Sequence, residues 1–298
     1  MKTHCRLASL ASLAALALPL FLTGCSLFPS TRKLPVPKAP TLIKTATPEE
    51  LVSQLDKRWE ALDSLTATVE IQATQTKTKE GIAQISPTLH GHILMRKPAM
   101  LRVFGQYLGV RVFDLASDGE EFTLSIPPQK RAIKGSNNRK NKSVNALENL
   151  RPGFFFDAMM VRGLEPNDQY SVTPETFMVE DAAKKHLISV PQYNLRITRY
   201  QAGSQKETLV RVVYFHRDDL MPYQQDIYDS EGNIETQVFY SGYQDFEGGK
   251  YPSMVIIKRP IDGIDIVLSV DDVHQNEPLK DDQFVVTPAE GATIQHLE

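Results

Sequence analysis

Few side chains in this sequence are spaced for catalysis or metal binding. His90 and His92 flank Gly91, so on a strand both imidazoles would lie on one face, where a metal ion could use them. No third ligand stands nearby in the sequence, so two polar strand residues are the alternative interpretation. Four carboxylates near the C-terminus fit no calcium-loop spacing and suit a solvated sheet end: Asp271, Asp272, Asp281 and Asp282. We therefore expect no metal site.

The sequence also lacks the motifs of known catalytic classes. It contains no Gly-x-Ser-x-Gly, no phosphate-binding loop, no dinucleotide fingerprint and no HExxH. We therefore expect no enzyme, no catalytic residues and no bound cofactor. A run over residues 130–142 holds six basic residues and no acid; it could contact anionic headgroups or form a solvated loop.

Cys25 has the clearest chemistry. A basic start is followed by an apolar run over residues 7–22, shorter than the roughly 20 residues of a spanning helix. The run ends in Leu-Thr-Gly-Cys (residues 22–25), which resembles the bacterial lipobox. The resemblance implies a signal peptide over residues 1–24, diacylglycerol on the Cys25 thiol and an N-acyl chain such as palmitate. An ordinary cleavage site with a chance cysteine is the alternative.

Cleavage before Cys25 would change both the cysteine content and the net charge of the chain. Cys5 would leave with the signal peptide, so an acylated Cys25 would leave no free thiol and no disulfide. Removing Lys2 and Arg6 from the 33 basic residues leaves 31 against 36 acidic residues, a net charge of −5. This acidic balance is unfavourable for nucleic acid. A hydrophobic content of 41% is enough for one sizeable core.

The remaining chain divides by pattern. Residues 25–47 are rich in proline and predict an extended tether, followed by a folded domain over residues 48–298. Its first element is an amphipathic helix over Thr47 to Leu62, because Thr47 can cap and Pro48 suits the first helical position. The apolar stripe of this helix consists of Leu51, Leu55, Trp59 and Leu62.

Beyond Leu65 the apolar period changes from helical spacing to two. Alternation over Val69 to Thr74 and over Ile264 to Asp271 is typical of antiparallel strands with one covered face. About a dozen strands are expected. One interruption, Ser143 to Arg162, has a dense apolar face and predicts one or two short helices.

Two strands are apolar on both faces, over residues 208–215 and 253–259. In the first, Leu209, Val213 and Phe215 are expected on one side, and Val210, Val212 and Tyr214 on the other. Such strands either lie beneath cover on both faces or line an apolar cavity. The predicted fold is mainly β (α+β), with a single curved antiparallel sheet forming a half-open barrel and helices covering its concave side. The candidate cavity-lining residues are Leu124, Phe154, Phe155, Met159, Val213, Phe215 and Ile257.

Two segments resemble the LolA/LolB-like superfamily of bacterial lipoprotein carriers and receptors. The first is "MRKPAMLRVFGQYLGVRVFDLASDGEEFTLSIPPQKRAIKG", residues 95–135, and the second comprises "YPSMVIIKR", "IDIVLSV" and "LKDDQFVVTP" near the C-terminus. The resemblance implies a half-open barrel with a hydrophobic cavity for acyl chains. In that superfamily the receptors are themselves lipoproteins. A lipidated Cys25 would therefore group this chain with the receptors and not with the carriers.

The receptors carry a leucine in a Pro-Leu-Gly loop that protrudes towards the membrane. Leu108 takes that position here and Tyr107 replaces the proline, so these two residues form a candidate membrane-insertion loop. Packing into the core at a strand end is the alternative. The chain departs from the family in its longer tether, its longer basic loop and extra strands between Phe177 and Tyr200.

The resemblance implies a function in the cell envelope. We expect a monomeric lipoprotein, anchored at the periplasmic face of the outer membrane, that binds acyl chains or lipidated proteins and helps their transfer or insertion. Membrane lipid and lipoprotein acyl chains are the expected partners, a soluble periplasmic carrier is a further candidate, and nucleic acid is not expected. The alternative is a sensor or scaffold lipoprotein of the same fold that binds a protein partner in the periplasm.

Overall fold

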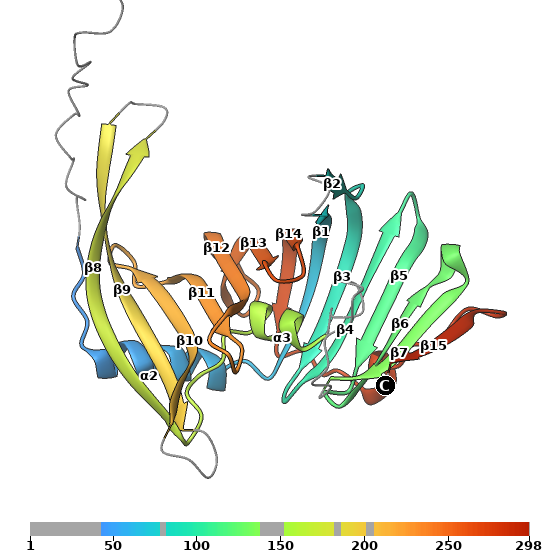
Figure 1. The fold of residues 1–298 in the computed structure, drawn as a ribbon, viewed down its shortest axis with the longest axis horizontal. Helices are drawn as coiled ribbons and strands as arrows, with labels where there is room; N and C mark the ends of the chain where they lie inside the picture. The colour runs from blue at the N-terminus through green and yellow to red at the C-terminus, as the bar shows by residue number, and fades with distance from the viewer. Residues whose placement is uncertain (1–42, 78–81, 138–151, 182–185, 201–205, 298) are drawn as a thin grey trace, which may run out of the picture. The chain divides into compact units, whose positions relative to one another are not determined.

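A computed structural model describes residues 43–77, 82–137, 152–181, 186–200 and 206–297 (Figure 1). The lipidation candidate Cys25, most of the tether, residues 138–142 of the basic run and residues 143–151 lie outside this range. The chain divides into two compact units: residues 39–177 with 189–298, and residues 178–188 with 1–38. In the smaller unit the structure describes only the end of one strand and the start of the next.

The described residues form fifteen strands in one sheet. The strands are β1 (Ser64–Lys77), β2 (Ile82–Ile85), β3 (Leu89–Arg96), β4 (Met100–Tyr107), β5 (Val110–Ser117), β6 (Glu121–Ile126), β7 (Arg131–Ser136), β8 (Asp168–Asp181), β9 (His186–Tyr200), β10 (Glu207–His216), β11 (Pro222–Tyr228), β12 (Ile234–Phe246), β13 (Gly249–Arg259), β14 (Ile264–Gln275) and β15 (Thr293–Leu297).

The strand order is β15-β7-β6-β5-β4-β3-β1-β14-β13-β12-β11-β10-β9-β8, with β2 paired to β1. From β7 to β9 along this path, neighbouring strands are antiparallel. The exception to the predicted antiparallel sheet is β15, which runs parallel to β7. Residues 276–292 lead from β14 to β15, which lies at the edge of the sheet beside β7. The path has two ends, β15 and β8, so the sheet is not closed into a barrel.

Helix α2 (Pro48–Glu60) begins where the sequence predicts. The Thr47 hydroxyl accepts a hydrogen bond from the Glu50 amide, and the Glu50 carboxylate accepts one from the Thr47 amide. This capping box satisfies two amides that the first helical turn leaves free. Helix α3 (Gly153–Met159) is one short helix within the predicted region. Among the described residues, no helix has the length and apolarity to cross a membrane.

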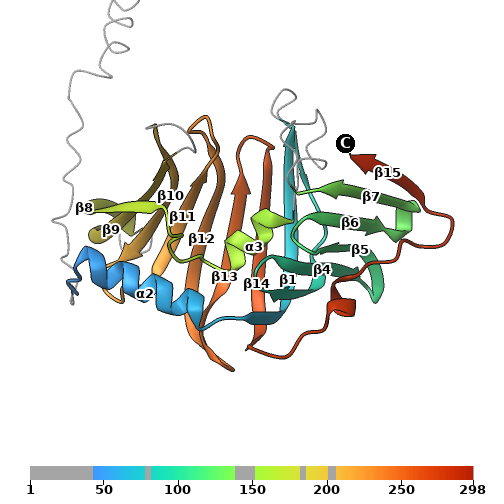
Figure 2. The same cartoon turned by 90° about the horizontal axis from the view of Figure 1, so that it is seen from below.

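Both helices lie on the same, concave face of the sheet (Figures 1 and 2). From α2, Leu51 and Leu55 pack on β9 and β10, against residues such as Leu195 and Phe215. Phe154–Met160 packs into the largest core cluster with strands β1, β3, β4 and β12–β14. This packing removes apolar surface from water, which stabilises the fold by about 25 cal/mol for each Å² of apolar surface buried.

A bulge in β10 corrects one detail of the sequence interpretation. Leu209 pairs with Thr198 but Arg211 pairs with Ile197, so Val210 is an extra residue on this strand. A bulge breaks the alternation of side chains. Arg211 therefore shares the inner face with Val213 and Phe215, and the expectation that Leu209 joins them is wrong.

Candidate ligand cavity

A cavity of about 360 Å³ lies between the C-terminal half of α2, the end of α3 and strands β11–β14. Its wall is formed by Leu55, Arg58, Trp59, Ala61, Leu62, Met159, Met160, Val161, Pro222, Tyr240, Tyr243, Gly249, Lys250, Tyr251, Pro252 and Gln275. Ligand pockets generally measure roughly 300–1,000 Å³, so this volume suits one small ligand or one chain of a larger ligand. We refer to this space as the ligand cavity.

Three tyrosines give the ligand cavity ring surface and little free hydroxyl. Tyr240 donates to the Ala158 carbonyl at 2.7 Å and Tyr251 donates to the Met159 carbonyl at 2.8 Å. These carbonyls belong to the last turn of α3, where no helical amide can reach them. Tyr243 donates to the Pro222 carbonyl at 2.7 Å. Burial raises the pKa of all three phenols, so their hydroxyls remain protonated donors.

Two further groups complete the wall. Trp59 is the single tryptophan of the chain, and its ring meets Phe156 edge-on at 6.4 Å between centroids. Lys97 lies over the Trp59 ring at 4.3 Å, a cation–π arrangement. Met159 and Met160 add unbranched thioethers, which adapt to ligands of varied shape. The wall is therefore apolar and aromatic over most of its surface.

The charged residues of the wall are all positive. Arg58 and Lys250 are cationic, Gln275 is neutral, and no aspartate or glutamate lines the ligand cavity. The Arg58 guanidinium contacts the Met221 sulfur. Burial lowers the pKa of Arg58, while Tyr243 and Asp219 act in the opposite direction, but arginine stays charged in proteins. Among the described residues, neither cation has an acidic oxygen within ion-pair distance.

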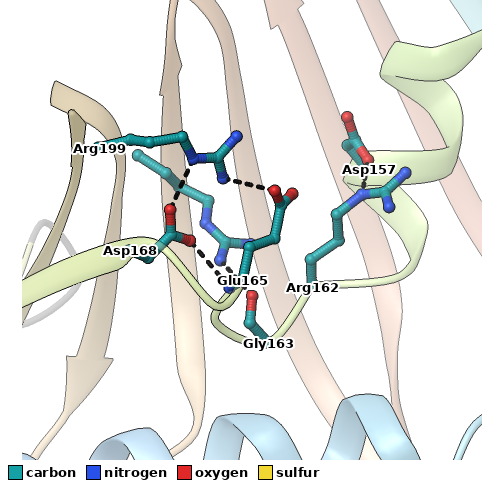
Figure 3. Close-up of polar contacts among 7 residues, drawn as sticks. Asp157, Arg162, Gly163, Glu165, Asp168 and Arg199 are labelled. Carbon is teal, nitrogen blue, oxygen red and sulfur yellow. Dashed lines mark hydrogen bonds and ion pairs between the residues drawn. The ribbon is translucent and has the colours of Figure 1, made fainter. Parts of the chain in front are cut away.

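A second pocket, of about 350 Å³, lies beside α3 and strands β8–β11. We call it the arginine pocket; its wall is Asp157, Arg162, Gly163, Glu165, Asp168, Ile197, Arg199, Val210, Arg211 and Ile227. Figure 3 shows that Arg162 and Arg199 face acidic partners.

The ion pairs of the arginine pocket tie the segment after α3 to the sheet. Arg199 donates from Nε to Asp168 at 2.7 Å and pairs with Glu165 at 3.0 Å, and Arg162 pairs with Asp157 (Figure 3). The Asp168 hydrogen bond raises the pKa of Arg199 most strongly. The buried Arg211 donates to the Gly163 carbonyl at 3.1 Å. These contacts hold the chain that presents Met160 and Val161 to the ligand cavity.

The predicted cavity residues occupy several places. Met159 lines the ligand cavity. Phe154, Phe155 and Ile257 are buried in the largest core cluster, and Val213 and Phe215 are buried beneath α2. Leu124 packs in a separate small cluster with Leu115, Phe122 and Ile133.

No sequence pattern points to Arg58, Lys250 or the three cavity tyrosines. Trp59 falls on the apolar stripe of α2, whereas its neighbour Arg58 lies off that stripe. Tyr240 and Tyr251 bond to α3 across 82 and 92 positions of sequence. No local pattern encodes a contact of that separation, although tyrosines on an inner strand face are a general signal for a cavity wall.

The hairpin tip between β4 and β5 exposes three apolar side chains, those of Tyr107, Leu108 and Val110. Leu108 is 88% exposed and Tyr107 is 46% exposed, so packing into the core does not explain Leu108. Leu108 and Gly109 both have positive φ, +48° and +79°. Such two-residue turns favour Asn-Gly, and a leucine in this region is strained by on the order of 1 kcal/mol. The chain therefore keeps an exposed leucine at a position where asparagine would be more stable.

The two histidines of β3 have a neighbour that the sequence did not reveal. Cross-strand pairing places Glu70 beside His90, with 3.3 Å between carboxylate and Nδ1. Side-chain ligand atoms of Glu70, His90 and Asp271 lie within 4.8 Å of one another. Two of the three side chains are exposed, and exposed groups of this kind are common on sheet surfaces.

Neither a protein-family model nor a curated protein matches the sequence. Solved structures do match. A LolA superfamily protein from Nitrosomonas europaea is 14% identical, covers 81% of this chain and 99% of its own, and has a TM-score of 0.47. A DUF1329 family protein from Desulfovibrio piger is 12% identical, with coverages of 80% and 95% and a TM-score of 0.48.

A third match is a domain named for outer membrane lipoprotein sorting, from Vibrio parahaemolyticus. It is 12% identical, covers 80% of this chain and 94% of its own, and has a TM-score of 0.45. At these identities the likeness concerns the fold alone. One of these matches is named for the superfamily that the sequence motifs resemble.

Proposed function

We propose that this chain is a lipid-anchored envelope protein that binds an acyl chain in the ligand cavity, without catalysis, and assists the transfer of lipids or lipoproteins at the outer membrane. The observation that carries the proposal is the ligand cavity of about 360 Å³ beneath α2, whose wall is mostly apolar and aromatic. Transfer requires only that the cavity compete with a bilayer for the chain. Burial of apolar surface supplies that free energy at about 0.8 kcal/mol per methylene.

The single tryptophan allows a direct test of acyl binding. Bromine atoms on an acyl chain quench tryptophan emission on contact, so brominated fatty acids should quench Trp59 saturably in the full-length protein carried in phosphatidylcholine nanodiscs. In an Ala61→Phe variant the quenching should fall strongly. Ala61 lines the cavity but is exposed, so the fold tolerates a ring that narrows the space. Quenching that never saturates, or that is equal in this variant, would contradict acyl binding in the cavity.

Two features support attachment to a membrane. The Leu-Thr-Gly-Cys ending supports acylation of Cys25, and a Cys25→Ser variant should lack the acyl mass in intact-protein mass spectrometry. The exposed Tyr107–Leu108 tip supports a second contact with lipid, because an aromatic ring and a leucine suit the headgroup boundary.

The tip can be tested without harming the fold. Leu108→Asn should raise the free energy of unfolding by on the order of 1 kcal/mol, because asparagine tolerates positive φ. The same change, made in protein that lacks residues 1–25, should weaken association with liposomes in a sedimentation assay. Unchanged liposome association in the more stable variant would show that Leu108 does not reach the bilayer.

A further inference from the structure

The ligand cavity combines an apolar wall with cations that the fold leaves without acidic partners. Arg58 is partly buried at the wall, and the hydrogen-bond acceptor of its guanidinium among the described residues is the Met221 sulfur, a weak acceptor. Asp219 acts on Arg58 electrostatically but lies beyond ion-pair distance. Lys250 lines the same space, and the wall contains no carboxylate. A guanidinium removed from water without an acceptor is unfavourable, and it becomes favourable when an anionic oxygen occupies its remaining donors.

We propose that the ligand cavity selects amphiphiles with an anionic headgroup, a carboxylate or a phosphate, whose chain lies against Trp59 and the tyrosines and whose headgroup binds Arg58. This inference rests on the proposed acyl binding and adds the class of headgroup. Arginine suits the role because its planar fork matches the oxygens of both headgroups. Lys250, which is exposed, supplies a second positive charge to the same wall.

The position of Arg58 near the end of α2 offers a competing explanation. Basic residues in the last helical turn are stabilised by the helix dipole, and Lys57 shares that turn. Lys57 is exposed and does not line the ligand cavity. The pair Arg58 and Lys57 therefore separates ligand recognition from the dipole, because the same substitution at both positions removes one charge from the same turn.

The experiment compares three probes that share one brominated chain: the fatty acid, its methyl ester and the alkyl phosphate. Quenching of Trp59 in the full-length protein, in phosphatidylcholine nanodiscs and at a pH where the acid is ionised, gives an apparent Kd for each. The ratio of ester to anion Kd is compared between proteins, because partition of each probe into the lipid is the same for every variant. We expect Arg58→Met to lower this ratio about tenfold for at least one anionic probe.

The controls decide what the ratio means. Lys57→Met should leave the ratio unchanged, Arg58→Lys should restore part of it, and the methyl ester should bind wild type and Arg58→Met alike. Equal ratios in wild type and Arg58→Met, with the ester still bound, would overturn headgroup recognition and leave acyl binding standing. Failure of all three probes to quench Trp59 saturably would overturn both.

Discussion

The two pockets on the concave face are nearly equal in volume, but they differ in whether acidic residues line the wall beside the cations. In the arginine pocket, of about 350 Å³, Arg162 and Arg199 each have an acidic partner on the same wall, and the buried Arg211 donates to the Gly163 carbonyl. In the ligand cavity, of about 360 Å³, Arg58 and Lys250 stand without one. Paired charges fix the position of a segment, whereas an unpaired cation beside apolar surface is available to a ligand. The comparison assigns structure to one pocket and binding to the other.

The largest expected effect tests the structural assignment. Arg199→Ala leaves the Asp168 carboxylate, whose side chain is 2% exposed, without its cation. We expect a loss of about 3 kcal/mol in the free energy of unfolding, which corresponds to a fall in Tm of roughly 6–12 °C for a domain of this size. Thermal unfolding measures it. Arg196→Ala, an exposed arginine on the same strand, should change stability by less than about 0.5 kcal/mol.

A bound ligand should stabilise the protein through the ligand cavity alone. Fatty acid at about 100 times its Kd should add about 2.7 kcal/mol. The increment should be the same in Arg199→Ala, since distant sites contribute additively, and it should disappear in Ala61→Phe. An increment that Arg199→Ala abolishes would mean that the two pockets are one functional unit.

The smallest effect has the opposite sign from the first. Arg58→Met removes a partly buried charge that lacks an acceptor and keeps an unbranched apolar stem, so the free protein should be unchanged or more stable by at most about 1 kcal/mol. Denaturant unfolding without ligand measures this. A clear destabilisation would show that Arg58 supports the fold and would remove the contrast between the pockets.

The sequence predicts the elements of this fold better than their assembly. Thr47, Pro48 and Glu50 specify the start of α2 because a cap is a local structure. Alternation identifies strands such as β1 and β14, because a strand with one covered face alternates apolar and polar residues whatever its partners are. The parallel β15 and the bulge at Val210 leave no such trace, because both depend on partners far along the chain.

The candidate site was predictable only in part. Met159 and Trp59 appear in sequence as apolar residues facing inward, which indicates a covered surface but not a space within it. The difference between Ile257, packed solid, and Tyr251, on a cavity wall, lies in the neighbours that each meets. Arg58 becomes informative only when the wall around it proves to lack acids.

The central strand has a consequence for how this protein must fold. β1 is the first strand along the chain, yet it pairs with β14 near the other end of the chain, as in Leu65 opposite Gln275. Contacts of such sequence separation raise the contact order and slow folding. A long loop must close, at a cost in chain entropy, before the paired strands contribute any stabilising free energy. The strand in the middle of the sheet therefore keeps one edge open until almost the whole chain is available. During that interval the exposed edge is a template for wrong pairing, so refolding yield should depend steeply on protein concentration.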